Sequence, residues 1–310
     1  MASLAEEAIR AIDETFGRHD GYRVAHAKGL LCSGTFVATP EAGVLTRAPH
    51  MQGGEVPVTV RFSNGSSDPH AADYARDARG MATKFYLDGA RTDIVAVTLP
   101  CFFVDTPEDF VAFTRANKRV VGGLPGPRLA CYLATHRKAW PAAAAAARLK
   151  PPVSYATCLY NAIHAYRWMA ADGSQRFVRY TWVPGAGERS LSGRDAARRG
   201  RDYLQEELGE RLARGPIRFT LRVQIAAPGD PTRDATAVWP EDRQHADVGT
   251  LTLTGLETDR EQGGDVLVFD PTRVIDGIEL SEDPLLRLRS HAYSISVERR
   301  SGVARPAELG

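Results

Sequence analysis

The strongest constraint on the fold is an alternation of apolar and polar residues with a period of two. It is clearest at 217–225, where the apolar positions are Ile217, Phe219, Leu221, Val223 and Ile225. Successive side chains of a β-strand point to opposite faces, so this pattern predicts a strand with one buried and one exposed face. Alternation or a high content of β-branched residues predicts further strands at 25–36, 56–63, 76–86, 92–97, 177–182 and 249–254.

Helical patterns lie before, between and after these strands. Apolar residues at helical spacing run from Leu4 to Phe16, and Ser3 with Glu6 forms the signature of a capping box. Further helices are expected after Thr106, over the alanine run 142–147, at 195–212 and at 283–300. About seven or eight strands with inserted helices, and no glycine-rich phosphate loop, predict an α+β fold built on an antiparallel barrel.

The whole chain is expected to form one domain over residues 1–310. Its parts are an N-terminal helix at about 3–17, barrel strands at about 23–104 and 176–257, and a final helix at about 283–300. No internal repeat and no linker interrupts this pattern. A chain of this length can bury a large core and enclose a binding pocket.

The overall composition is ordinary for a soluble globular protein. The chain is 43% hydrophobic and 25% charged with a net charge of +1, so neither nucleic acid nor an acidic partner is expected. The four cysteines show neither CxxC spacing nor histidines at zinc-like offsets, which indicates a reducing compartment. Without a positively charged leader or a run of about 18 apolar residues, we expect a cytoplasmic protein and no membrane-spanning segment.

The final helix carries a tyrosine between two arginines on one face. At about 100° per residue, Arg289 lies about 40° from Tyr293, and Arg300 lies within about 20° of it. The arginine favours the phenolate form by charge and hydrogen bonding, and a phenolate suits ferric iron. On these residues alone, an Arg–Tyr stack on a packed helix is the simpler alternative. His26, taken alone, suits a hydrogen-bonded core histidine.

Five motifs in the same order resemble the haem-pocket segments of monofunctional haem catalases. They are Arg23-Val-Ala-His-Ala-Lys-Gly29, Val60-Arg-Phe-Ser63, Arg76-Asp-Ala-Arg-Gly-Met-Ala-Thr-Lys-Phe-Tyr86, Asp93-Ile-Val95 with Pro100-Cys-Phe-Phe103, and Arg289-Ser-His-Ala-Tyr293. The resemblance spans roughly residues 23–300. It implies an eight-stranded antiparallel β-barrel with surrounding helices, haem b with ferric iron as cofactor, and a small, truncated member of the family.

The resemblance also implies roles for individual residues. His26 matches the distal catalytic histidine, and Ser63 matches the serine that orients it. Tyr293 matches the proximal iron ligand, and Arg289 the arginine that holds it as the phenolate. The remaining matches contact the haem itself: Arg23, Arg61 and Arg300 at the propionates, and Phe110 as a distal aromatic.

Two departures from the family pattern change the expected activity. Ala96-Val-Thr-Leu-Pro100 replaces the Gly-Asn-Asn-Thr-Pro run of catalases, so Val97 stands where the catalytic asparagine is expected. The chain also ends soon after the final helix, so we expect neither the wrapping segment and C-terminal catalase domain nor the NADPH site. Because the asparagine amide helps to position a second peroxide, its loss predicts slow dismutation.

We therefore predict a haem peroxidase that reduces hydrogen peroxide or organic hydroperoxides with organic electron donors. The apolar Ala25, Val97 and Leu99 leave open an allene-oxide-synthase-like enzyme that rearranges fatty-acid hydroperoxides. A non-enzymatic haem-binding or sensing protein is a further alternative, although binding alone does not need His26 and Ser63. A homo-oligomer is left open. Five further histidines show no spacing typical of a metal site: His50, His70, His136, His164 and His245.

Overall fold

The alternating segments form the strands of one antiparallel sheet in a computed structural model of the chain. The structure describes residues 3–118, 126–257 and 267–298. The strands are β1 (Gly29–Ala38), β2 (Glu55–Asn64), β3 (Arg79–Leu87), β4 (Ala90–Val97), β5 (Tyr160–Asn161), β6 (Tyr166–Met169), β7 (Gln175–Pro184), β8 (Ile217–Ile225), β9 (His245–Leu256) and β10 (Ile278–Leu280).

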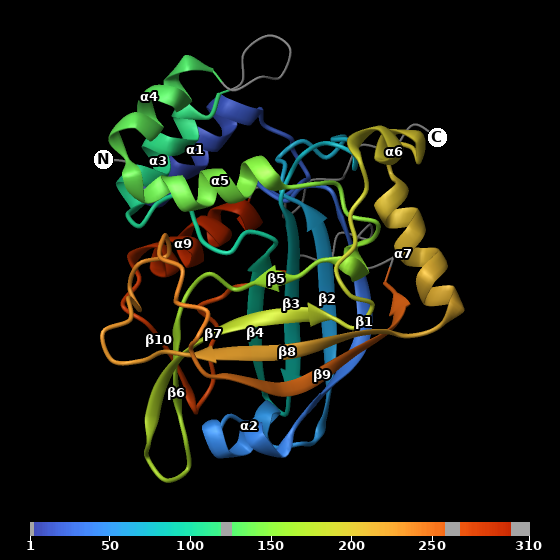
Figure 1. Cartoon of the computed structure of the whole chain (residues 1–310), viewed down its shortest axis with the longest axis vertical. Helices are drawn as coiled ribbons and strands as arrows, with labels where there is room; N and C mark the ends of the chain where they lie inside the picture. Colours follow the sequence, from blue (N-terminus) through green and yellow to red (C-terminus); the bar gives the residue numbers. More distant parts are fainter. Residues whose placement is uncertain (1–2, 119–125, 258–266, 299–310) are drawn as a thin grey trace.

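β7 closes this sheet into a barrel, because it pairs with β5 and also with β8. The closed ring runs β1-β2-β3-β4-β5-β7-β8-β9 and returns to β1, while β6 and β10 extend the sheet from β7. Figure 1 shows the long strands side by side around the barrel. The predicted eight-stranded antiparallel barrel with surrounding helices is confirmed.

Large apolar side chains fill the inside of the barrel. Phe62, Phe85, Trp182 and Phe219 are fully buried in one core cluster, and the ring centroids of Phe62 and Phe219 are 5.9 Å apart. Neighbouring residues of a strand point to opposite faces. The residues on either side of Phe62 therefore belong to the outer face of the wall.

One row of paired residues crosses that outer face at the end of the barrel where β1 begins. Gly29 pairs with Ser63, Ser63 with Gly80, Gly80 with Val97, and Val97 with Asn161. Directly opposite residues of antiparallel strands project to the same face. Ser63 and Val97 therefore share a face, and Gly80 between them contributes no side chain.

The helices cover the barrel from two sides. One group of helices gathers at one end of it, and α6 and α7 lie along the side of the barrel away from α9 (Figure 1). The first group is α1 (Leu4–Phe16), α3 (Pro107–Ala116), α4 (Pro127–Thr135), α5 (Trp140–Arg148) and α9 (Pro284–Glu298). The others are α2 (Pro40–Leu45), α6 (Gly193–Arg198), α7 (Tyr203–Arg214) and the 3-10 helices η1 (Pro49–Met51), η2 (Arg137–Ala139) and η3 (Tyr155–Thr157).

The ends of several elements differ from the sequence prediction. The capping box of Ser3 and Glu6 on α1 is confirmed. β1 begins at Gly29 rather than at residue 25, because His26 has a φ of 56° that does not continue a strand. The helix predicted at 195–212 is two helices, with Gly200 at a φ of 102° between them.

The sequence pattern does not predict β5, β6 or β10, nor the helices α2 and α4. The three strands have two, four and three residues, which is too short for a period to show. Arg300 and the predicted end of the final helix lie outside the described residues. Within the described ranges, no helix is long and apolar enough to cross a membrane. The single domain over 1–310 and the cytoplasmic location stay predictions.

Candidate active site

His26 lies just before β1 with an unusual backbone conformation. Its φ of 56° makes it the one left-handed non-glycine residue in the described part of the chain, and this conformation costs about 1–3 kcal/mol. Arg61, a buried residue of β2, holds the backbone in place. Its Nη1 donates to the carbonyl oxygen of His26 at 2.9 Å, and its Nη2 donates to that of Ala27 at 3.2 Å. Two hydrogen bonds from the barrel wall thus hold the backbone around His26 in place.

The imidazole of His26 packs against the row that contains Ser63. Its Nδ1 is 3.0 Å from Ser63 Oγ. A Cβ built on Gly80 would lie 2.7 Å from Ser63 Oγ and 2.8 Å from His26 Nδ1, so only glycine leaves room for this contact. The geometry agrees with Ser63 as the residue that orients His26. The catalytic role of the pair stays a prediction.

The surroundings of His26 keep its imidazole neutral. Burial and the positive charges of Arg61, Arg289 and Arg23 lower the pKa of His26 to about 3, although a backbone hydrogen bond at Asn64 acts in the opposite direction. The histidine is therefore uncharged at neutral pH and can accept a proton. The contribution of Arg289 also shows that α9 lies within electrostatic reach of His26.

Tyr293 on α9 is held by Arg289, which lies one helical turn earlier. Nε and Nη2 of Arg289 donate to the phenol oxygen at 3.0 and 2.6 Å. Arg289 Nη1 lies 3.1 Å from His164 Nε2, and His164 Nδ1 lies 2.8 Å from Asp283 Oδ2. His164 and Asp283 are both buried. Asp283, His164, Arg289 and Tyr293 therefore form a chain of side-chain contacts, the Tyr293 chain, which ends at the phenol oxygen.

The charges along this chain follow from its neighbours. Burial disfavours the positive charge of Arg289, but Tyr293, Tyr166 and Asp270 outweigh it and raise the pKa of the guanidinium. Burial lowers the pKa of His164, although Asp283 acts against it. At neutral pH the arginine is thus a cation beside the phenol, and His164 is a neutral link between Arg289 and Asp283.

Arg23 and Phe110, two further residues matched to haem contacts, each contact another part of the chain. Arg23 Nη1 donates to the carbonyl oxygen of Leu267 at 3.0 Å. Phe110 of α3 stacks on Phe102, with ring centroids 6.1 Å apart. The predicted contacts of Arg23, Arg61 and Phe110 with a haem stay predictions, and Arg300 lies outside the described residues.

Comparison of the sequence with a protein-family model shows which family has this barrel and these side chains. The model described as catalase matches residues 18–306. This chain belongs to the catalase family. Membership of the catalase family makes it an oxidoreductase.

Individual relatives place this catalase-family protein near small members of the family. A catalase-related peroxidase of Mycolicibacterium paratuberculosis is 49% identical over 98% of this chain and 96% of the relative. A second, of Synechococcus elongatus, is 33% identical over 96% of this chain and 88% of the relative. A catalase of Vibrio parahaemolyticus is 33% identical over 88% of this chain, but this match covers only 57% of the relative.

Solved structures agree on the fold of this catalase-family chain. A fungal catalase superposes with a TM-score of 0.79 at 25% identity, covering 92% of this chain and 61% of the fungal chain. A bacterial catalase superposes with a TM-score of 0.80 at 24% identity, covering 92% of this chain and 58% of the other. The barrel and its helices are therefore those of larger catalases.

Catalase-family proteins bind haem, and the residues of this site fit that group. A phenol oxygen that accepts two hydrogen bonds from an arginine suits ferric iron. Arg23 and Arg61, whose charges act on His26, are cations of the kind that carboxylates such as propionates need. The charges of Arg289 on α9 and of Arg61 on β2 both act on His26.

Two members of the Tyr293 chain, His164 and Asp283, could not be identified from the sequence. In the sequence, His164 is a histidine without a partner spacing, and Asp283 is only the first residue of the helix predicted at 283–300. In the structure, Asp283 caps α9, since its Oδ1 accepts from the Leu285 N–H at 2.9 Å. His164 lies 119 residues from Asp283 and 125 from Arg289. No local pattern can reveal contacts at such separations.

Proposed function

We propose that this chain is a haem peroxidase that reduces hydrogen peroxide or organic hydroperoxides with organic electron donors. Dismutation of hydrogen peroxide is slow in this proposal. The observation that carries it is the row across β2, β3 and β4, in which Ser63 is present beside His26 but Val97 occupies the far position. The proton-handling pair is kept, and the side chain at position 97 offers no amide.

The chain offers residues that would hold haem b on both sides. Tyr293 would be the iron ligand, and the two hydrogen bonds from Arg289 would stabilise negative charge on the Tyr293 oxygen. Arg23, Arg61 and Arg300 would balance the propionates, with Phe110 beside the ring. When bound, the ferric haem would supply electrons to the peroxide and recover them from the donor.

His26 would move the proton in the reaction with peroxide. Ser63 engages Nδ1, so Nε2 is the nitrogen available to the substrate. Nε2 would accept a proton from one peroxide oxygen and return it to the other as the O–O bond breaks and water leaves. A positioned acid–base group of this kind contributes about 10²–10⁴ in rate.

Val97 would weaken only the reaction with a second peroxide. Its side chain has no hydrogen-bonding group, so it cannot position a second peroxide molecule as a reductant. Loss of one such donor costs about 10²–10³ in rate at other preorganised sites. An organic donor that needs no contact with Val97 would then reduce the oxidised enzyme instead.

The proximal assignment is tested by absorption spectra after haem reconstitution. We expect stoichiometric binding of haem in the wild type, and a lost or shifted ferric spectrum in Tyr293→Phe. Tyr86→Phe is the matched control, because the Tyr86 hydroxyl contacts Thr59 Oγ1 on the barrel wall instead. An unchanged spectrum in Tyr293→Phe would remove Tyr293 as the ligand.

The activity is tested by following phenol oxidation and oxygen evolution with the same peroxide. We expect phenol oxidation to be the faster reaction in the wild type, and Val97→Asn to raise oxygen evolution about tenfold or more. Val44→Asn, at an exposed position of α2, is the control. Rapid oxygen evolution by the wild type would contradict the proposal. Conversion of a fatty-acid hydroperoxide without consumption of a donor would favour the rearrangement alternative.

A further inference from the structure

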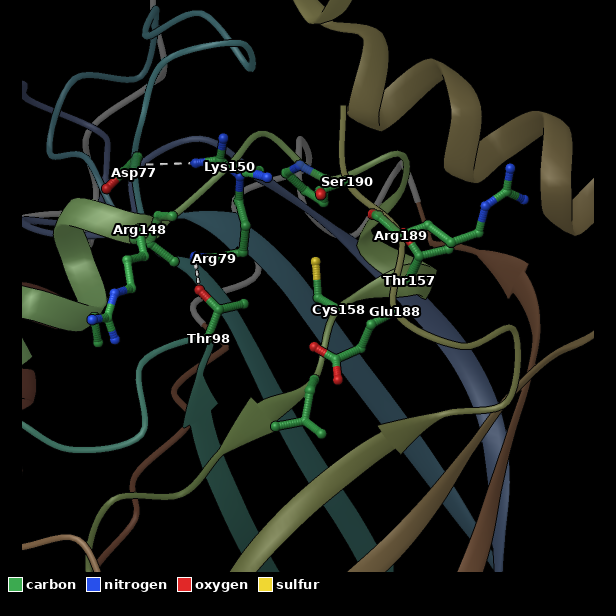
Figure 2. Close-up of a pocket in the computed structure, with 14 residues that line it drawn as sticks. Asp77, Arg79, Thr98, Arg148, Lys150, Thr157, Cys158, Glu188, Arg189 and Ser190 are labelled. Atoms are coloured by element: carbon green, nitrogen blue, oxygen red, sulfur yellow. Dashed lines mark hydrogen bonds and ion pairs between the residues drawn. The ribbon is translucent and has the colours of Figure 1, made fainter. Parts of the chain in front are cut away.

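A cavity of about 300 Å³ lies beside the His26 site but has its own lining. Figure 2 shows it between the ends of β3 and β4, the segment after α5 and residues 188–190. Arg79 and Thr98 form one wall, where Thr98 N donates to Arg79 O at 2.9 Å. Arg79 precedes Gly80, the residue on which His26 packs. The cavity and His26 therefore lie beside neighbouring residues of β3.

Glu188, an exposed residue of the lining, offers a hydrogen-bond acceptor to the cavity. Figure 2 shows the Glu188 carboxylate turned towards the middle of the cavity, near Cys158. Within the described ranges, its carboxylate has no hydrogen bond or ion pair. Leu149 and Leu159 add apolar surface to the lining. An ionised carboxylate only accepts hydrogen bonds, so it selects a ligand with a hydroxyl donor on an apolar body.

The rim of the cavity is positively charged. Arg148, Lys150 and Arg189 are exposed there, and their side chains make no ion pair with any residue that the structure describes. The guanidinium groups of Arg148 and Arg189 extend outwards in Figure 2. Long side chains of this kind at an opening attract an anion and orient it by its charged end.

We propose that this cavity binds a small aromatic acid with a phenolic hydroxyl, and that this acid is the organic reductant of the enzyme. The hydroxyl donates to Glu188, the ring packs on Leu149 and Leu159, and the carboxylate faces the rim. The role as reductant rests on the proposed peroxidase function. Two phenols each lose one electron and the O–H proton to become phenoxyl radicals, and one hydrogen peroxide takes up both electrons and both protons to give two waters.

Binding is tested by calorimetry on the haem-loaded protein without peroxide, using three matched probes. 4-Hydroxyphenylacetate carries both groups, 4-hydroxyphenylacetamide lacks the charge, and 4-methoxyphenylacetate lacks the hydroxyl donor. We expect the first to bind about tenfold more tightly than either of the others, since each lacks one polar contact. Binding of the first should also weaken with added salt, because the rim cations are exposed. Equal affinities for the three probes would overturn the proposal.

Two variants separate the contribution of the rim cations from that of Glu188. Lys150→Glu is expected to weaken the hydroxy acid about tenfold and leave the amide unaffected, whereas Glu188→Ala weakens both phenols and leaves the methoxy acid unaffected. Arg128→Glu on α4 and Glu210→Ala on α7 are exposed controls outside the lining. A site elsewhere would give wild-type affinities in Lys150→Glu and Glu188→Ala, and this result would also overturn the proposal.

Turnover with peroxide distinguishes failure of the cavity from failure of the proposed function. We expect the ratio of kcat/KM for the hydroxy acid over the amide to fall about tenfold in Lys150→Glu. Oxidation of both phenols without preference for the acid would leave the peroxidase standing and remove the cavity as its donor site. Binding of the acid without any phenol oxidation would leave the binding site, and would overturn both its role as reductant site and the proposed function.

Discussion

At the scale of single residues, Gly80 decides whether His26 and Ser63 can meet. A Cβ at this position would lie under 3 Å from both side chains, at 2.7 Å from Ser63 Oγ and 2.8 Å from His26 Nδ1. We expect Gly80→Ala to displace the imidazole and to lower the rate of the peroxide reaction by about 10² or more, because misplacement of about 1 Å has effects of that size. Stopped-flow absorbance of the haem protein measures this rate.

Gly54→Ala is the control for this substitution, because a Cβ at Gly54 would meet no atom within 4 Å. It should react with peroxide like the wild type. A wild-type rate in Gly80→Ala would mean that the contact between His26 and Ser63 does not limit the reaction.

His164 acts on Tyr293 only through Arg289, and this makes it a positioning residue. His164→Leu would leave Arg289 Nη1 and Asp283 Oδ2 without this buried partner, at a cost of about 1–3 kcal/mol for each group. We expect a lower free energy of unfolding by urea, together with a shifted ferric haem spectrum. The exposed substitution His245→Leu should change neither. A destabilised protein with an unshifted spectrum would restrict His164 to a structural role.

At the scale of elements, the closure of the barrel depends on close contact between β1 and β9. A Cβ on Gly34 would lie 2.2 Å from the carbonyl oxygen of Thr252, beside a shift in register between Ser33 and Gly34. A backbone oxygen within a ladder cannot move aside without breaking its pairing. We expect Gly34→Ala to lower the free energy of unfolding by about 1–3 kcal/mol, measured by urea titration. Gly193→Ala, which would meet no atom, is the control, and equal stability of the two variants would contradict this account.

The sequence predicts elements well where a period repeats and poorly where tertiary contacts decide. β8 runs over 217–225 as its alternation predicts. The prediction of a strand through His26 is wrong, because the guanidinium of Arg61 captures two carbonyl oxygens there, and Arg61 is 35 residues away from His26. β5 has two residues and completes the ring, yet two residues carry no periodic signal.

At the scale of the whole molecule, the candidate site joins parts of the chain that only the fold brings together. The spacing of Arg289 and Tyr293 could be read locally, because both lie on one helix. The pairing of His26 with Ser63 followed from the family resemblance, and the geometry agrees with it. His164, Gly80 and the cavity beside Arg79 could not be predicted, because each depends on packing between elements distant in sequence.

The folded molecule also holds a buried histidine far from this site. His50 in η1 is 1% exposed and lies beside Phe85, at the opposite end of β3 from Gly80. Burial lowers the pKa of His50 to about 4. Its position makes the histidine a probe of acid stability that is independent of the haem site.

The pH dependence follows because His50 binds a proton at a higher pH in the unfolded chain than in the folded protein. Below its ordinary pKa of about 6.5, His50 is protonated in the unfolded chain but stays neutral in the folded one, so stability is full above this pH and is lost as the pH falls towards about 4. Between about pH 7 and pH 5 this histidine should cost about 2 kcal/mol of stability.

We expect His50→Phe to lose about 2 kcal/mol less stability than the wild type over this pH interval, as measured by urea unfolding. The comparison is within each variant, so a change in packing cancels. His245→Gln should retain the wild-type dependence, and an equal dependence in His50→Phe would show that other groups govern acid unfolding.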